Sequence, residues 1–225
     1  MNIVITGGSR GFGRAIAEKL HTTHTCILIA RASEALTETG QKLGCKIYAC
    51  DVTSGIEVQK TIETIEATNG PIDVLINNAG TWIEGALETN SYEEIARAIQ
   101  TNVLGVMYVA KAVIPAMKTR QNGFIINVSY QSGFKTKAER SVYQASKWAV
   151  RGFSHSLLEE LHSFNIRVTT LYPGTAQTEL FARGKKQVNP EKSLRAEDMA
   201  ETVAWLIAQP PSVVFPEIGF KHLHQ

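Results

Sequence analysis

The chain has 225 residues, 44% of them hydrophobic, which suits one α/β domain with a single sizeable core. Its 23 basic and 21 acidic residues give a formal net charge of +2, so no broad electrostatic attraction to nucleic acid or to a membrane surface is expected. No signal-peptide pattern opens the chain, and Lys111 and Pro115 interrupt its most apolar helical stretch, Val103–Met117. We therefore expect a soluble, cytoplasmic protein without membrane or nucleic-acid partners.

Strand-like and helix-like segments alternate along the whole chain. Short apolar runs, rich in β-branched residues, are the predicted strands: Asn2–Thr6, Thr25–Ala30, Lys46–Cys50, Val74–Asn77, Phe124–Ser129 and Arg167–Tyr172. Segments with helical periodicity are the predicted helices: Gly13–His21, Glu34–Lys42, Ser54–Thr68, Ser91–Met117, Ser141–Phe164 and Ala196–Ala208. Because the strands are apolar almost throughout, helices should cover both of their faces. The pattern predicts one domain over residues 1–225, a doubly wound parallel sheet of about seven strands.

The three cysteines, Cys26, Cys45 and Cys50, form no C-x-x-C pair and have no histidine at metal-ligand spacing. We expect small side chains in or beside strands, a reducing compartment and no metal site. The polar segment Glu179–Arg195 is the longest irregular stretch, and it could serve as a lid.

A glycine-rich turn follows the first strand and opens the first helix. Gly7, Gly11 and Gly13 have the spacing G-x-x-x-G-x-G, and glycines there let the backbone approach a diphosphate at the helix N-terminus. The same segment also spells G-x-S-x-G around Ser9, the pattern of a hydrolase nucleophile. A serine hydrolase is the weaker interpretation, because the six histidines lie on helices, beside helix ends or in the tail.

Further motifs in chain order resemble the short-chain dehydrogenase/reductase family, and the resemblance covers nearly the whole chain. They are the T-G-x-x-x-G-x-G loop from Thr6, Asp51-Val52, the N-N-A-G run from Asn77, Asn102, the Y-x-x-x-K pair Tyr143 and Lys147, and Pro173-Gly174 followed by Thr178. The resemblance implies a Rossmann-type fold, a nicotinamide cofactor and a homodimer or homotetramer. It points to a carbonyl reductase or alcohol dehydrogenase that acts on a small molecule.

Tyr143 and Lys147 stand at i and i+4, so one helix face carries both side chains. A phenol with a pKa near about 10 exchanges protons poorly at neutral pH unless a positive charge favours phenolate. We expect Lys147, together with the oxidised nicotinamide, to make the Tyr143 phenol easier to ionise. The resemblance implies that Asn102 holds a water that links Lys147 to solvent.

One family position is occupied by an unexpected residue. The family has a serine thirteen residues before the catalytic tyrosine, and this chain has Tyr130 there. Ser129 should point to the opposite face of the strand end, and Ser132 reaches the site only if the loop bends back. Either Tyr130 or Ser132 replaces the missing donor, or the protein is a catalytically weakened NADPH-binding regulator.

The cofactor expected from the sequence is NADP(H), with NAD(H) less favoured. Ile29-Ala30-Arg31-Ala32 offers an arginine and no carboxylate at the end of the second strand, and Arg10 could form the other half of a clamp on a 2′-phosphate. The residues expected to bind the cofactor are Gly7, Ser9, Arg10, Gly11, Phe12, Gly13, Arg31, Asp51, Val52, Asn78, Ala79, Gly80, Tyr143, Lys147, Pro173, Gly174 and Thr178.

Four aromatic residues fall in segments that surround the substrate in similar proteins. They are Trp82, Tyr130, Phe134 and Phe181. They suit an apolar or aromatic ketone or aldehyde, and simple core packing explains them equally well.

Overall fold

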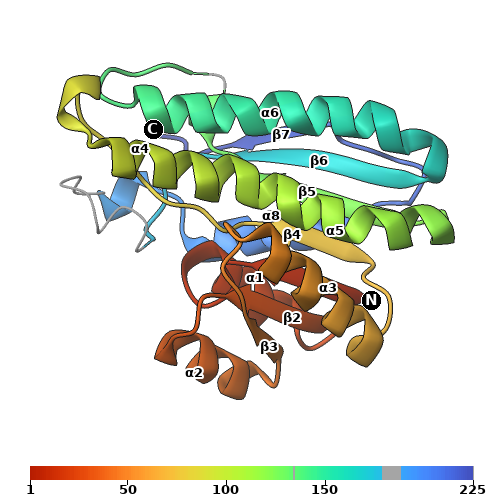
Figure 1. The fold of residues 1–225 in the computed structure, drawn as a ribbon. Coiled ribbons are helices and arrows are strands. Elements are labelled where there is room, and N and C mark those ends of the chain that lie inside the picture. The colour runs from red at the N-terminus through yellow and green to blue at the C-terminus, as the bar shows by residue number, and fades with distance from the viewer. Residues whose placement is uncertain (134, 179–188, 225) are drawn as a thin grey trace.

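The computed structural model describes residues 1–133, 135–178 and 189–224. Seven parallel strands form one sheet in the order β3-β2-β1-β4-β5-β6-β7 (Figure 1). The strands are β1 (Asn2–Thr6), β2 (Thr25–Ala30), β3 (Lys46–Ala49), β4 (Val74–Asn77), β5 (Gly123–Val128), β6 (Ile166–Pro173) and β7 (Glu217–Phe220). The predicted doubly wound parallel sheet is confirmed.

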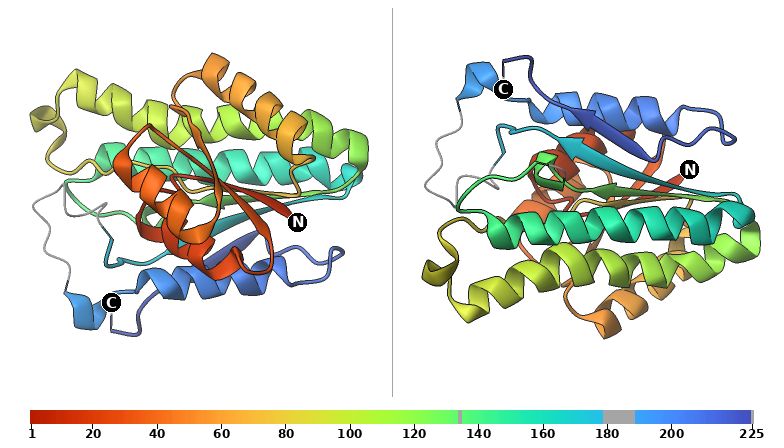
Figure 2. Two further views of the ribbon diagram at one scale, coloured as in Figure 1. Left: turned by 90° about the horizontal axis from the view of Figure 1, so that it is seen from below. Right: turned by 90° about the horizontal axis from the view of Figure 1, so that it is seen from above.

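Helices cover both faces of the sheet (Figure 2). One face carries α1 (Gly11–Leu20), α2 (Glu34–Leu43) and α8 (Ala196–Ile207), and the other carries α3 (Gly55–Asn69), α5 (Gly105–Arg120) and α6 (Ser141–Leu161). Successive residues of β1 point to opposite sides, so that Ile3 and Ile5 join the core under α1 and α8 while Val4 joins the core under α3 and α5. Both faces are thus apolar, which is why the strands show no polar alternation.

The helix before β5 is interrupted. It consists of α4 (Tyr92–Ile99), a π-helical segment (Gln100–Leu104) and α5, where a single helix over Ser91–Met117 was expected. Tyr92–Arg120 is the one helix in the described ranges that is long and apolar enough to cross a membrane, and half of its most apolar window is buried in the protein. Val109 and Val113 of α5 belong to the core of the sheet, so this helix is accounted for as a core helix.

The ends of the predicted elements lie within three residues of the observed ones, and those of β1, β2 and β4 coincide with them. β7 forms within a segment that had no predicted strand, and it pairs with β6 from Thr170↔Glu217 to Pro173↔Phe220. Short 3-10 turns complete the described structure at Leu87–Thr89, Gln131–Gly133, His162–Phe164 and Pro190–Lys192.

The strand order reverses beside β1. The chain runs outward from β1 through β2 to β3 and then returns to place β4 on the other side of β1. Loops that leave the carboxyl ends of β1 and β4 therefore diverge, and a crevice opens between them. This is the position at which doubly wound sheets bind their ligands.

Candidate functional site

A cavity of about 910 Å³ lies at the carboxyl ends of the strands. Loops that follow six strands, β1 to β6, contribute residues to its wall. Of the residues expected at the site, the following line it: Gly7, Ser9, Arg10, Gly11, Phe12, Arg31, Asp51, Val52, Asn78, Ala79, Gly80, Tyr130, Tyr143, Lys147, Pro173, Gly174 and Thr178. Segments that are distant in the sequence thus form one binding site.

The glycine loop has the backbone that its sequence demands. Gly7 and Gly11 have φ angles of +67° and +54°, in the left-handed region that favours glycine. Gly13 does not line the cavity; a Cβ there would lie 2.3 Å from the carbonyl oxygen of Gly7. Gly13 therefore lets α1 pack against the turn, while the other glycines bring the backbone to the cavity wall.

The N-terminus of α1 differs from those of its neighbours. Ser33, Ser54 and Ser91 cap α2, α3 and α4 by accepting a backbone N–H. In α1, all of which is described, the N-cap residue Arg10 makes no side-chain cap and the first turn contains no acidic residue. The positive end of this helix and its backbone donors therefore face the cavity, an arrangement that fits the diphosphate of a dinucleotide.

Thr6 fastens the β1 loop to the β4 loop, a role that sequence reasoning does not assign. Its Oγ1 accepts the backbone N–H groups of Asn78 and Ala79, each at 3.0 Å. The Asn78 side chain returns two bonds, from Nδ2 to the carbonyl oxygens of Thr6 (3.0 Å) and Gly7 (3.3 Å). The threonine that precedes the glycine loop in the sequence was the available signal.

Two arginines line the cavity beside the ends of β1 and β2. Arg10 and Arg31 are both exposed and both line it, and the described lining at the end of β2 consists of Ile29, Ala30, Arg31, Ala32 and Ser33, without a carboxylate. Asp51, after β3, accepts two bonds at its Oδ1, from the backbone N–H and the hydroxyl of Thr53. The Asp51 carboxylate therefore orders its own turn.

Tyr143 and Lys147 lie one turn apart on α6 and are 2% and 5% exposed. The Lys147 Nζ donates to the carbonyl oxygen of Val128 at 3.2 Å and lies 5.6 Å from the centre of the Tyr143 ring. Burial lowers the pKa of Lys147 to about 8. This ammonium therefore stays charged at neutral pH and loses its proton in mildly alkaline solution.

The ease of ionisation expected at Tyr143 depends in part on the charge of the oxidised nicotinamide, and it stays a prediction. Burial raises the pKa of Tyr143, the neighbouring Tyr130 raises it further, and the positive charge of Arg140 opposes both effects. The Lys147 ammonium is directed at a backbone carbonyl, so desolvation of the phenol outweighs its influence. The pairing of the two side chains on one helix face is as expected.

Asn102 is fully buried in the π-helical segment and does not line the cavity. Its Oδ1 accepts the Thr81 N–H at 2.8 Å, and its Nδ2 donates to the Thr81 carbonyl oxygen and to Ser146 Oγ. The side chain thus joins the β4 loop to α6 beside Lys147. Its role in holding a water stays a prediction.

Tyr130 projects into the cavity from the end of β5. Its hydroxyl lies 2.8 Å from Thr175 Oγ1, and its ring centre lies 5.8 Å from that of Tyr143. Ser129 donates its hydroxyl to the Lys147 carbonyl oxygen at 3.1 Å, so its proton is committed to the helix backbone. Phe134, Phe181 and the Ser132 side chain lie outside the described residues, as does most of the expected lid, residues 179–188.

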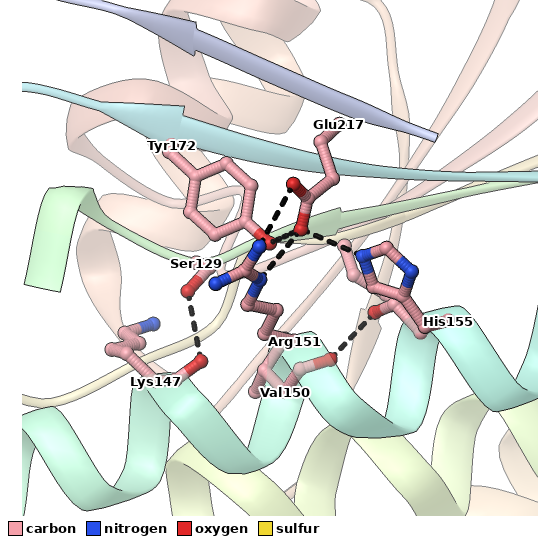
Figure 3. A network of polar contacts seen from close by, with 9 residues as sticks. Ser129, Lys147, Val150, Arg151, His155, Tyr172 and Glu217 are labelled. Carbon is pink, nitrogen blue, oxygen red and sulfur yellow. Dashed lines mark hydrogen bonds and ion pairs between the residues drawn. The ribbon is translucent and has the colours of Figure 1, made fainter. Parts of the chain in front are cut away.

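A polar network beside the cavity fixes β7 to α6 (Figure 3). Glu217 accepts bonds from Arg151 (2.7 Å) and Tyr172 (2.7 Å), and His155 lies 2.7 Å from the same carboxylate oxygen. Burial opposes ionisation, but the bonds from these three partners prevail and lower the pKa of Glu217 to about 2. The network holds the helix that carries Lys147 against the sheet.

The alternative of a serine hydrolase finds no support in this arrangement. All six histidines belong to the described part of the chain, and none lines the cavity that contains Ser9. Ser9 is 8% exposed, and its carbonyl oxygen accepts a bond from Thr39. Among the described residues, no group of three His, Cys, Asp or Glu side chains is placed to hold a metal ion.

Comparison with known proteins decides the family. Residues 1–189 match the family model described as short chain dehydrogenase. The chain belongs to the short-chain dehydrogenase family. It is 32% identical over 221 residues to an uncharacterized oxidoreductase of Staphylococcus aureus (strain USA300), a match that covers 96% of this chain and 94% of the relative.

Two relatives with higher identity match a shorter part. An oxidoreductase of Botryotinia fuckeliana is 39% identical over 179 residues, which are 78% of this chain and 65% of that protein. A 3-ketodihydrosphingosine reductase of Bacteroides thetaiotaomicron is 39% identical over 176 residues, 78% of this chain and 64% of that protein. The chain therefore spans somewhat less than two thirds of the length of these two relatives.

Solved structures agree with the family. A serine dehydrogenase complexed with NADP⁺ has a TM-score of 0.92 at 30% identity, covering 100% of this short-chain dehydrogenase and 96% of that chain. An alcohol dehydrogenase from the archaeon Thermococcus sibiricus, complexed with 5-hydroxy-NADP, has a TM-score of 0.89 at 28% identity, covering 100% and 97%. The chain is thus an oxidoreductase by family, with neighbours that hold a nicotinamide cofactor.

Proposed function

We propose that this short-chain dehydrogenase is an NADP(H)-dependent oxidoreductase that interconverts a small carbonyl compound and its alcohol. The observation that carries the proposal is that Tyr143, Lys147 and the glycine loop line one cavity. Such a site places a proton-donating side chain in the space that also holds the dinucleotide. A carbonyl reductase or alcohol dehydrogenase needs this combination.

The preference for NADP(H) is proposed from two arginines in the wall of the cavity. Arg10 and Arg31 offer two guanidinium groups, which suit the bidentate binding of a phosphate on the adenosine ribose. Similar structures, a serine dehydrogenase and an alcohol dehydrogenase, are complexed with NADP⁺ or an NADP derivative. Fluorescence titration tests the preference: NADPH should bind more tightly than NADH, and Arg31→Asp should reverse the order.

The protein's own residues handle the proton, while the cofactor, when bound, supplies or accepts the hydride. Tyr143 donates its phenolic proton to the carbonyl oxygen during reduction and accepts a proton from the alcohol during oxidation. Lys147 stands one turn away, and its positive charge favours the phenolate that a donation leaves behind. The Tyr130 hydroxyl, bound to Thr175, orients the substrate oxygen in place of the family serine.

A catalytically weakened NADPH-binding regulator is the second candidate. The observation that favours it is Tyr130 at the serine position, because the bulky ring occupies part of the site beside Tyr143. Turnover of NADPH separates the two candidates: the enzyme consumes cofactor with a carbonyl substrate, and the regulator binds cofactor without consuming it.

The assembly proposed for this enzyme is a homodimer or homotetramer of single-domain chains in the cytoplasm. The outer side of α6 carries Trp148, 45% exposed, a large apolar side chain of the kind that subunit contacts cover. Light scattering coupled to size-exclusion chromatography tests this, and a monomeric mass would overturn it.

The deciding assay follows the absorbance of NADPH and NADH with a panel of aromatic and aliphatic ketones and aldehydes. Turnover with NADPH supports the enzyme and shows that Tyr130 permits catalysis. Saturable binding without turnover supports the regulator, and no binding of either cofactor would overturn both.

A further inference from the structure

Trp82 packs against the catalytic tyrosine. It follows β4 in the chain, and its ring centre lies 4.4 Å from that of Tyr143. Both side chains line the cavity, and Tyr143 is only 2% exposed. The indole therefore covers one side of the Tyr143 ring within the cavity wall.

Arg140 lies against the same indole, with its guanidinium carbon 5.0 Å from the centre of the Trp82 ring. It directly precedes α6 and is 8% exposed, and its Nε and Nη2 both donate to Glu84 Oε1, at 3.1 and 2.9 Å. A neighbouring bond, from the Gly85 N–H to the Glu139 carbonyl oxygen at 2.8 Å, joins the same two segments. A charge this deeply buried requires such a partner, and a guanidinium over an indole gains from the ring's negative face.

Within the described ranges, four titratable side chains from three segments lie around Tyr143. Lys147 comes from α6, Tyr130 from the end of β5, Arg140 from the N-terminus of α6, and Glu84 from the β4 loop, where it is paired with Arg140. Lys147 directs its ammonium to the Val128 carbonyl oxygen. Arg140 lowers the pKa of Tyr143 against the opposing effect of burial. A cation outside the family motif thus acts on the reacting group.

We propose that Arg140 is a positioning residue for Tyr143: paired with Glu84 and stacked on Trp82, it holds the indole against the phenol and keeps a positive charge near the phenol. The inference rests on the proposed function, in which Tyr143 exchanges the proton. It adds a buried ion pair that couples the β4 loop to the catalytic helix.

The test compares Arg140→Met, Arg140→Lys and Glu84→Gln with the parent protein. Alcohol oxidation requires the Tyr143 phenolate, so its rate rises with pH. Arg140→Met, which loses the charge, should move this rise to higher pH by about half a unit, whereas Arg140→Lys should keep the rise at the parent's pH. Glu84→Gln leaves the cation uncompensated and should move the rise to lower pH. Arg195→Met, which removes an exposed arginine paired with Asp198, is the matched control and should leave the profile in place.

A second readout does not depend on turnover. In a Trp148→Phe/Trp205→Phe background, Trp82 is the only tryptophan, and its emission and quenching by acrylamide report its packing. Arg140→Met should shift the emission to the red and at least double the quenching constant, whereas Arg195→Met should not. Unchanged Trp82 emission in Arg140→Met would overturn the inference, and so would a pH profile that does not move in folded Arg140→Met.

Absence of turnover in the parent protein would count against the proposed function, and the fluorescence result then decides alone whether Arg140 holds Trp82. If Arg140→Met fails to fold, Glu84→Gln and Arg140→Lys decide the matter. A profile that moves to lower pH in Glu84→Gln and stays in place in Arg140→Lys supports the inference, and a profile that stays in place in Glu84→Gln overturns it.

Discussion

Replacing Tyr130 with phenylalanine removes one hydroxyl and keeps the ring. Tyr130 is 7% exposed, and its hydroxyl shares a 2.8 Å hydrogen bond with Thr175. Loss of that bond should lower the free energy of unfolding by about 1 kcal/mol, because one buried hydrogen bond contributes roughly that much. If the hydroxyl also orients the substrate oxygen, its loss should raise the barrier by about 2.7 to 4 kcal/mol and lower kcat by a factor of about 10² to 10³.

Steady-state NADPH consumption measures the catalytic effect, and urea unfolding measures the stability effect. Thr175→Val is the matched control, because it removes the partner of the hydroxyl and leaves Tyr130 in place. It should cost a similar stability and much less activity. A Tyr130→Phe enzyme with kcat within about threefold of the parent would refute the assignment of Tyr130 as donor, because a well-aimed donor contributes more. A gain in turnover by Tyr130→Ser would refute it as well.

Three further predictions concern the charge of Lys147, the close packing at Gly13 and the ion pairs of Glu217. Because burial lowers the pKa of Lys147 to about 8, the charge of this side chain is present below that pH and lost above it. Carbonyl reduction should therefore slow above pH 8 in a stopped-flow pH series, and Lys147→Arg should flatten that decline. Gly13→Ala places a Cβ 2.3 Å from the Gly7 carbonyl oxygen and should weaken NADPH binding at least tenfold in a fluorescence titration. Gly152→Ala is the control and should leave the affinity unchanged, because no described atom lies within 4 Å of the new Cβ. The pKa of Glu217 is lowered from 4.5 to about 2, so its ion pairs stabilise the fold above pH 4.5 and lose this effect as the pH falls toward 2. Glu217→Gln should flatten the plot of melting temperature against pH between pH 4.5 and 2, and an unaltered plot would contradict the role of the network.

The sequence was sufficient for most of the sheet. The apolar runs of β1, β2 and β4 were predicted with their observed bounds, because a strand buried on both faces must be apolar throughout. β7 was not located, since four residues with Gly219 in their middle carry little periodicity and the strand depends on pairing with β6.

Site residues that belong to family motifs were likewise readable from the sequence. Spacing placed Tyr143 beside Lys147, and chain order indicated that both would meet the glycine loop. The pKa values were not predictable, because they depend on burial that only the packed structure reveals. The ion pair of Arg140 with Glu84 was not predictable either, since the two residues are 56 positions apart and belong to no motif.

The most direct test of the proposed enzyme is NADPH consumption by the parent protein and by Tyr143→Phe, with cofactor binding measured on both. The account predicts that the parent protein reduces at least one carbonyl compound of the panel. It also predicts that Tyr143→Phe loses nearly all of that turnover while it binds NADPH with the parent's affinity. Full turnover by Tyr143→Phe would contradict the central claim, because the proton would then come from another group.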